Sequence, residues 1–255
     1  MYQEEVAALA LAAEKKSRFM EQNALGYLLA SMLAGCYVGL GIMLIYTIGG
    51  LLAGAAHAKI LMGVSFGIAL SLVIIAGAEL FTGNNLVMMA GVLRGGVGWA
   101  QAAKLWVLCF VGNWLGAVVL ALLFWGAGLA TASTGDFIAG VSASKMATPP
   151  VQLFLRGFLC NILVCLATWC SYRCKSDSGK RIMIFWCLYC FITSGYEHGI
   201  ANMSLLTVGL LAPGGAAVSF AGYLYNILLV SFGNMLGAIV VIAVPYYVMS
   251  RDKTS

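Results

Sequence analysis

Charged side chains are scarce in this sequence of 255 residues: Asp, Glu, Lys and Arg make up 9% of it, whereas 62% of the residues are hydrophobic. Because a soluble domain carries about 25% charged residues, this composition excludes an ordinary water-soluble fold and indicates an integral membrane protein. A membrane-spanning helix needs about 20 apolar residues. The chain therefore has room for five or six such helices with short connections.

Histidine is also rare, and the cysteines form no framework. The two histidines are His57, in the connection after the first apolar run, and His198, so the chain lacks the ligands for a bis-histidine haem at membrane depth. All eight cysteines, including the CxxC of Cys187 and Cys190, lie in or beside apolar runs, where a free thiol behaves as a small hydrophobic group. We expect no disulfide framework, no metal, no cofactor, no enzymatic activity and no nucleic-acid partner.

Two apolar runs are interrupted in the same way. The stretch 74–84 reads IIAGAELFTGN and the stretch 192–202 reads ITSGYEHGIAN, so a glycine, a glutamate and an asparagine recur at equivalent positions. A polar break at membrane depth is tolerated only where the freed backbone is buried in protein or lines a cavity. Two matching breaks in two halves of a membrane protein indicate a translocation site.

The internal repeat extends beyond these breaks, because VGNWLGA at 111–117 recurs as FGNMLGA at 232–238. We assign the glycines of this second motif to close helix packing. Apolar runs that predict six membrane-spanning helices lie at about 25–49, 60–92, 102–129, 149–172, 182–210 and 216–249. Three helices per repeat is an odd number, so the second copy must enter the membrane inverted. The predicted fold is all-α, with two inverted three-helix repeats (about 25–129 and 149–249) and broken second and fifth helices.

The polar ends of the chain define the topology. Residues 1–23 predict an amphipathic helix at the cytoplasmic membrane surface, residues 24–250 the six-span domain, and residues 251–255 a short cytoplasmic tail. With the N-terminus inside, eleven of the 14 Lys and Arg residues fall in cytoplasmic segments, and only Lys59, Lys145 and Arg156 lie outside. This positive-inside bias predicts that both termini are cytoplasmic.

Glu79 and Glu197 are the only two of the nine acidic residues within the apolar runs, and they are repeat counterparts. A charge at membrane depth costs about 2.5–3.5 kcal/mol even on translocon scales, so both carboxylates require an explanation. One interpretation is a direct role in translocation. The other, which we favour, is that each carboxylate accepts hydrogen bonds from backbone N–H groups freed by its own helix break.

His198 and Thr82 depart from the repeat symmetry, because their counterparts are Leu80 and Ile200. A buried histidine is often a packed core residue, but the position of His198 at a helix break favours a functional role. A neutral imidazole and a hydroxyl can both donate to an acceptor-rich anion, and the imidazole titrates near physiological pH. Helix N-termini exposed by the breaks add positive partial charge. These features predict a path for a small oxyanion.

Apolar side chains beside the breaks are candidates for dry constrictions that gate a pore, namely Phe66, Leu70, Leu80, Phe81 and Phe191. Lys145 and Arg156 flank the outer start of the fourth run and could concentrate anions at an outer mouth. The alternative for Lys145 is a solvated loop charge. Lys15 and Lys16 could act similarly on the inside, with lipid headgroup binding as the alternative.

Three ordered motifs, GAELFTGN, LCNILVCLATW and SGYEHGIANM, resemble the signatures of the formate/nitrite transporter family of bacterial anion channels. The resemblance runs from about Leu25 to Tyr247, nearly the whole chain. Within the family, LCN-LVCLA, FTG and GYEH are most similar to the nitrite-channel branch. Two positions depart from the family pattern: Asn84-Asn85 follow FTG, where a more variable Ser, Thr or His is expected, and Gly199 follows EH, where Ser is common.

The resemblance implies an aquaporin-like fold and a homopentamer in a bacterial cytoplasmic membrane, with a separate pore in each protomer. It implies that His198 and Thr82 face the pore, that Asn161 lines it and that Lys145 lies in the outer vestibule. The inner constriction would comprise Leu70, Leu80 and Phe191, and the outer one Phe66 and Phe81. We add the polar residues of the breaks to the predicted pore and filter, namely Glu79, Glu197 and Asn202.

The predicted function is a pore for small monovalent anions, with nitrite first and formate and hydrosulfide also open, with or without proton coupling. A neutral-solute pore of the aquaporin type would need paired Asn-Pro-Ala loops and a constriction arginine, but neither break contains proline or arginine. A membrane oxidoreductase subunit is disfavoured by the missing cofactor ligands. A channel and a proton-coupled carrier are both consistent with the sequence.

Overall fold

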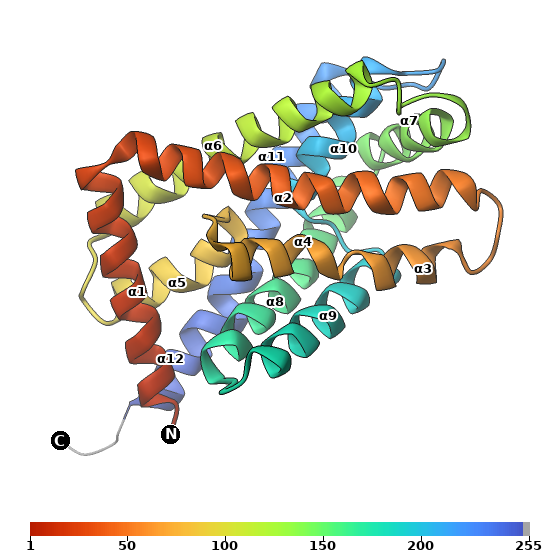
Figure 1. The fold of residues 1–255 in the computed structure, drawn as a ribbon. Coiled ribbons are helices and arrows are strands. Elements are labelled where there is room, and N and C mark those ends of the chain that lie inside the picture. Colours follow the sequence, from red (N-terminus) through yellow and green to blue (C-terminus); the bar gives the residue numbers. More distant parts are fainter. Residues whose placement is uncertain (252–255) are drawn as a thin grey trace.

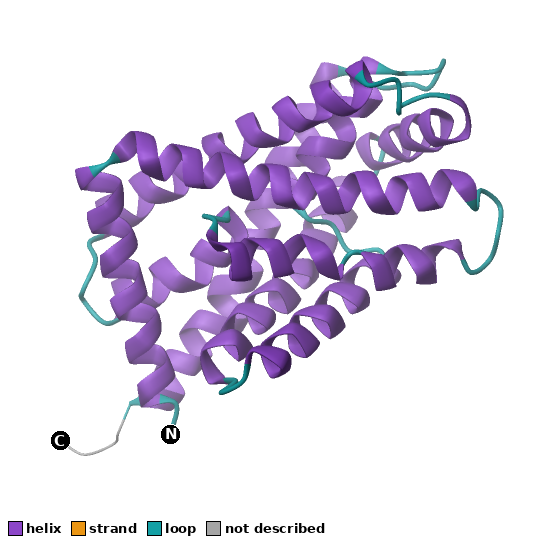
Figure 2. Cartoon of the chain, viewed as in Figure 1, coloured by secondary structure: helices purple, strands orange, loops and turns teal. Residues whose placement is uncertain are grey.

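The computed structural model describes residues 1–251, and every regular element in that range is a helix (Figure 2). The tail predicted for 251–255 lies, from residue 252 onward, outside the described residues. Helical segments that are long and apolar enough to cross a membrane are Ala24–Leu51, Ala58–Gly77, Trp99–Gly126, Pro150–Arg173 and Phe220–Ser250. By the length and composition of its helices, the protein crosses the membrane several times.

The first half of the chain folds into helices that follow the predicted N-terminal amphipathic segment and the predicted apolar runs. In order they are α1 (Gln3–Gln22), α2 (Ala24–Leu51), α3 (Ala58–Ser65), α4 (Gly67–Leu72), the π-helical η1 (Val73–Gly77), α5 (Phe81–Leu93) and α6 (Trp99–Gly126). The chain between η1 and α5 is extended at Ala78 and Leu80.

The second half begins with a helix that the apolar pattern does not predict. Its elements are α7 (Ala132–Met146), α8 (Pro150–Arg173), α9 (Asp177–Ser194), α10 (Gly199–Leu211), α11 (Phe220–Gly237), the π-helical η2 (Ala238–Ala243) and α12 (Val244–Ser250). Helix α7 is short and rich in small polar residues, but it buries Ile138 and Ala139 against the rest of the protein. Tertiary packing therefore stabilises a segment whose own sequence signal is weak.

Two helix pairs form the frame of the bundle: α2 packs along α6, and α8 packs along α11. At both contacts a repeat glycine lies against the backbone of the neighbouring helix, Gly116 at Met32 and Gly237 at Phe158, where a Cβ would overlap a carbonyl oxygen. Helices α1 and α12 lie at one end of the molecule, and α3 and α7 lie at the other (Figure 1).

Helix α1 packs on the body of the protein through its apolar face, which contacts α5, α2 and α8. Buried residues of this face include Leu9, Ala13 and Met20. At its start, the ring of Tyr2 lies edge-on to Trp169, and the Arg173 guanidinium lies 5.1 Å from the centre of the Tyr2 ring. The apolar face of α1 is thus occupied by protein.

Candidate functional site

The two breaks have the same backbone course. Gly77 and Gly195 both have positive φ values, of 82° and 79°. Leu80 and His198, the residues that precede α5 and α10, are both extended. A positive φ is accessible to glycine at little cost, which explains why glycine recurs at this position of the repeat.

Two asparagines satisfy the backbone that the breaks leave free. Asn113 Oδ1 accepts a hydrogen bond from the N–H of Phe81, and Asn234 Oδ1 accepts one from the N–H of Gly199, each at 2.9 Å. The side-chain amide of each asparagine also donates to the carbonyl of the glutamate in the same break, at 2.8 and 3.0 Å. These are the asparagines of the repeated GN–LGA motif, in which we assigned a role, close packing, only to the glycines. The glutamate carboxylates do not take this role, and the interpretation we favoured is wrong.

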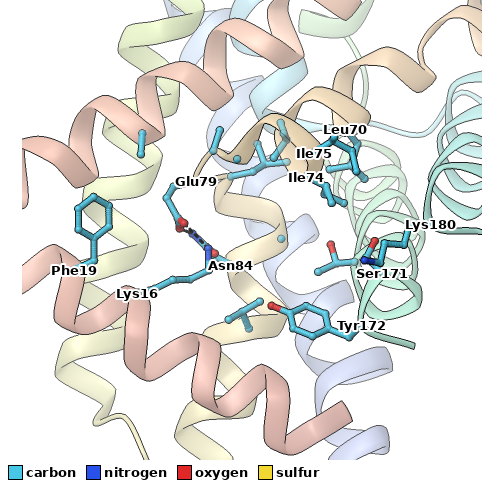
Figure 3. Close-up of a pocket in the computed structure, with 18 of the residues that line it drawn as sticks. Lys16, Phe19, Leu70, Ile74, Ile75, Glu79, Asn84, Ser171, Tyr172 and Lys180 are labelled. Carbon is cyan, nitrogen blue, oxygen red and sulfur yellow. Dashed lines mark hydrogen bonds and ion pairs between the residues drawn. The ribbon is translucent and has the colours of Figure 1, made fainter. Parts of the chain in front are cut away.

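In the first break, the Glu79 carboxylate is held by side chains from three helices. Lys16 reaches it from α1 with its Nζ at 2.5 Å, and Asn84 donates at 2.9 Å (Figure 3). The Tyr27 hydroxyl donates to the same carboxylate at 3.2 Å. The side chains of Lys16 and Glu79 are 23% and 14% exposed. Removing an ion from water costs several kcal/mol, which the opposite charge and the two neutral donors offset here.

The second break contains an equivalent arrangement. Lys145 reaches Glu197 from α7 with its Nζ at 2.5 Å, and Asn202 donates to the same carboxylate at 2.7 Å while also bonding to Asn226. The side chains of Lys145 and Glu197 are 15% and 5% exposed. Lys145 is therefore a largely buried ion-pair partner on a helix and not a solvated loop charge. Both lysines come from helices that precede a repeat, so the repeat alignment gives no signal for either pair.

The two residues that depart from the repeat symmetry meet in the structure. Thr82 Oγ1 lies 3.0 Å from His198 Nε2, and both side chains are buried. His198 Nδ1 accepts a hydrogen bond from the N–H of Ala201 at 3.1 Å, so in the neutral ring the proton is on Nε2 and points to Thr82. The Thr82 hydroxyl then accepts from His198 and retains its own proton for a further acceptor.

Asn161 supports this pair from α8. Its amide donates to the backbone carbonyls of Thr82, at 3.2 Å, and of Asn234, at 2.8 Å. Its Oδ1 has no hydrogen-bond partner among residues 1–251. Asn161 thus fixes the backbone that carries the Thr82 hydroxyl.

A cavity of about 700 Å³ lies beside the first break. Lys16, Glu79 and Asn84 form one wall, and Ser171, Tyr172 and Lys180 lie across the cavity from them (Figure 3). A second void, of about 10 Å³, is lined by apolar side chains and one imidazole, from Val38, Phe66, Ala69, Leu70, Leu80, Val164, Leu188, Phe191 and His198. Such a void accommodates about one water molecule.

Leu70 and Leu80 line both spaces, so they stand between the wide cavity and His198. Phe191 lines only the small void, and its ring lies edge-on to that of Phe66 with centroids 5.5 Å apart. Phe66, Phe191 and the two leucines thus all line the small void beside His198. Phe81 is buried against Phe110 and is absent from the lining of both spaces.

A family model described as formate/nitrite transporter matches residues 3–248. The chain belongs to the formate/nitrite transporter family. It is 40% identical over 248 residues to the nitrite transporter NirC of Escherichia coli (strain K12), which covers 97% of this chain and 92% of that protein. The family recognition from the three motifs is thereby confirmed.

Solved structures agree with this membership. An FNT family ion channel superposes with a TM-score of 0.92 at 38% identity, covering 97% of this chain and 99% of that one. A pentameric formate channel with formate bound superposes with a TM-score of 0.79 at 26% identity, covering 90% and 98%. The protein therefore has the all-helical, multi-pass membrane fold of this family.

Proposed function

We propose that this protein is a channel for small monovalent anions, with nitrite as the first substrate and formate and hydrosulfide as further ones. The observation that carries the proposal is the buried contact between Thr82 and His198, which joins the two breaks beside an apolar void. Similarity to a nitrite transporter over nearly the whole chain supports the choice of anion. The likeness to a pentameric formate channel supports a homopentamer with one pore in each protomer.

The membrane topology is part of the same proposal. The six spans are α2, α3 to α5, α6, α8, α9 to α10, and α11 to α12, arranged as two inverted repeats with broken second and fifth spans. Because α1 and α12 lie at the same end of the bundle (Figure 1), an even number of crossings fits the arrangement. With the basic segments inside, that end is the cytoplasmic one, in a bacterial cytoplasmic membrane.

The anion path runs from the 700 Å³ cavity past Leu70 and Leu80 to the Thr82–His198 pair. An anion loses its hydration in such a constriction, and this loss is costly unless protein donors replace the water. The free proton of the Thr82 hydroxyl and the N-termini of α5 and α10 supply that compensation. The lysines near the breaks are paired with glutamates, so they do not hold an anion as a lone ammonium would.

His198 acts in this scheme as a neutral donor that orients Thr82. Its Nδ1 already accepts the N–H of Ala201, so protonating the ring would break that bond at the start of α10. Direct hydrogen bonding is therefore the route we propose for lowering the barrier, in preference to proton transfer from His198 to the anion.

Flux measurements in liposomes test the function. The purified protein should carry nitrite, formate and hydrosulfide faster than chloride, compared at two pH values and with empty liposomes as the control. Equal and negligible rates for all four anions, from a correctly assembled protein, would refute the proposed function.

A further inference from the structure

A buried serine hydroxyl beside the first residue of α10 lacks a hydrogen-bond partner. Ser231 on α11 is 5% exposed, and its Oγ makes no hydrogen bond within residues 1–251. Serine hydroxyls in helices commonly donate back to the carbonyl four residues earlier, as Ser31 does to Tyr27 at 2.8 Å. Leaving a buried hydroxyl without a partner costs free energy, so Ser231 requires an explanation.

Ser231 lies directly against Gly199, the residue that follows His198. A Cβ at position 199 would overlap the Ser231 Oγ, so the hydroxyl occupies space that a side chain would otherwise take. Asn234, one turn further along α11, accepts the N–H of Gly199 at 2.9 Å. Helix α11 thus contacts the start of α10 through two side chains. The Asn234 amide is hydrogen-bonded to α10, whereas the Ser231 hydroxyl has no hydrogen-bond partner among residues 1–251.

We propose that Ser231 is a specificity-determining residue that donates a hydrogen bond to an oxyanion at the N-terminus of α10. This inference rests on the proposed function and adds a third side chain to the Thr82–His198 pair. The N-terminus of this 13-residue helix favours negative charge. The hydroxyls of Thr82 and Ser231 both have a proton available, and nitrite or formate has two oxygens with which to accept them. Chloride has no separate acceptor atoms and gains less from two directional donors.

The chain offers a matched control in Ser204. Its hydroxyl is also buried and without a partner among the described residues, and it also lies against a glycine, Gly39. Ser204 is five residues beyond Gly199 on α10, which corresponds to about 7.5 Å along the helix. Removing this hydroxyl reports the effect of deleting an unpaired buried polar group away from the Thr82–His198 pair.

The test compares anion selectivity in liposomes. Ser231→Ala should lower the ratio of nitrite flux to chloride flux by roughly threefold to tenfold, the effect of losing one hydrogen bond, and the ratio of formate to chloride should fall similarly. Ser204→Ala should leave both ratios unchanged. An unchanged ratio in Ser231→Ala, or an equal change in Ser204→Ala, would overturn the inference. If Ser231→Ala does not assemble, Ser231→Cys replaces it, because a thiol donates weakly.

A double variant that moves the hydroxyl from position 231 to position 199 tests whether selectivity requires the hydroxyl itself or the serine at position 231. Gly199→Ser alone should impair assembly, because the new side chain would overlap the Ser231 Oγ. Combining Gly199→Ser with Ser231→Ala moves the hydroxyl from α11 to α10. This double variant should restore the selectivity. A folded double variant with the low ratio of Ser231→Ala would contradict the role of the hydroxyl. A wild-type protein that carries none of the four anions would refute the proposed function, whereas anion flux with unaltered selectivity in Ser231→Ala would refute this inference alone.

Discussion

The break that precedes α5 and the break that precedes α10 share their backbone, their asparagine cap and their lysine–glutamate pair, with matching distances of 2.9 Å and 2.5 Å. They differ where Leu80 in one corresponds to His198 in the other, and where Thr82 corresponds to Ile200. The shared residues are those that a broken helix needs in a membrane. Thr82 and His198, which break the symmetry, meet between the repeats, and we therefore propose them as the functional positions.

The two breaks also differ in exposure. The first adjoins the 700 Å³ cavity, and its ion pair is more exposed than that of the second break, where Glu197 is only 5% exposed. A buried ion left without its partner costs more than an exposed one. Equivalent substitutions in the two breaks should therefore have unequal effects, and the following predictions use this difference.

The largest effect is expected from breaking the second ion pair. Glu197→Gln should destabilise the protein by about 3–5 kcal/mol, because it leaves the Lys145 ammonium buried without its counter-charge, whereas Glu79→Gln should cost less. Thermal unfolding in detergent measures both. The double variant Glu197→Gln/Lys145→Met should recover part of the loss, and equal losses in the two single variants would contradict the comparison.

Removing the asymmetric histidine should affect transport more than stability. His198→Ala should lower nitrite flux on the order of tenfold, since it removes the donor that orients the Thr82 hydroxyl. His198→Asn can still donate and should retain much of the flux and its pH dependence. Liposome flux between about pH 5 and pH 8, the range in which a free imidazole titrates, provides the measurement. If His198→Asn abolished a rise in flux at acidic pH, proton transfer would replace hydrogen bonding as the mechanism.

The asparagine caps are equivalent in the two breaks, so their removal should have equal effects, unlike removal of the glutamates. Asn113→Ala and Asn234→Ala should each destabilise the protein by about 1–3 kcal/mol, since each leaves a buried backbone N–H without an acceptor. The two losses should be similar, as judged by unfolding midpoints. A large difference between them would show that the breaks are not structurally equivalent.

The smallest effect is expected at the constriction. Phe191→Ala should raise flux severalfold or loosen selectivity, because it widens the void beside His198 and admits water. Phe81→Ala is the matched control, since Phe81 is equally buried but absent from the lining of both spaces. Conductance of the two assembled variants distinguishes them, and an unchanged Phe191→Ala channel would remove Phe191 from the constriction.

Lys145 is a residue whose partner the sequence did not predict. The positive-inside bias singles out Lys145 as one of three external cations, and this placement suggests a free charge that attracts anions. The structure pairs Lys145 with Glu197 through α7, a helix whose polar sequence gives no apolar signal. The location of an ion pair depends on which helix is packed beside the break, and local composition does not contain that information.

The sequence by itself determined the membrane class, the two breaks, the repeat and the exceptional status of His198 and Thr82, because each follows from composition or from spacing along the chain. Only the tertiary structure decided which partners these groups take: Lys16 for the Glu79 carboxylate, Asn113 for the Phe81 N–H and, among the apolar side chains, Phe66 for Phe191. The physical reason is that a polar group removed from water is stabilised by a hydrogen-bond or ion-pair partner, and most buried polar groups have one. Which partner it finds depends on how distant helices pack, and many different pairings would satisfy the same sequence pattern.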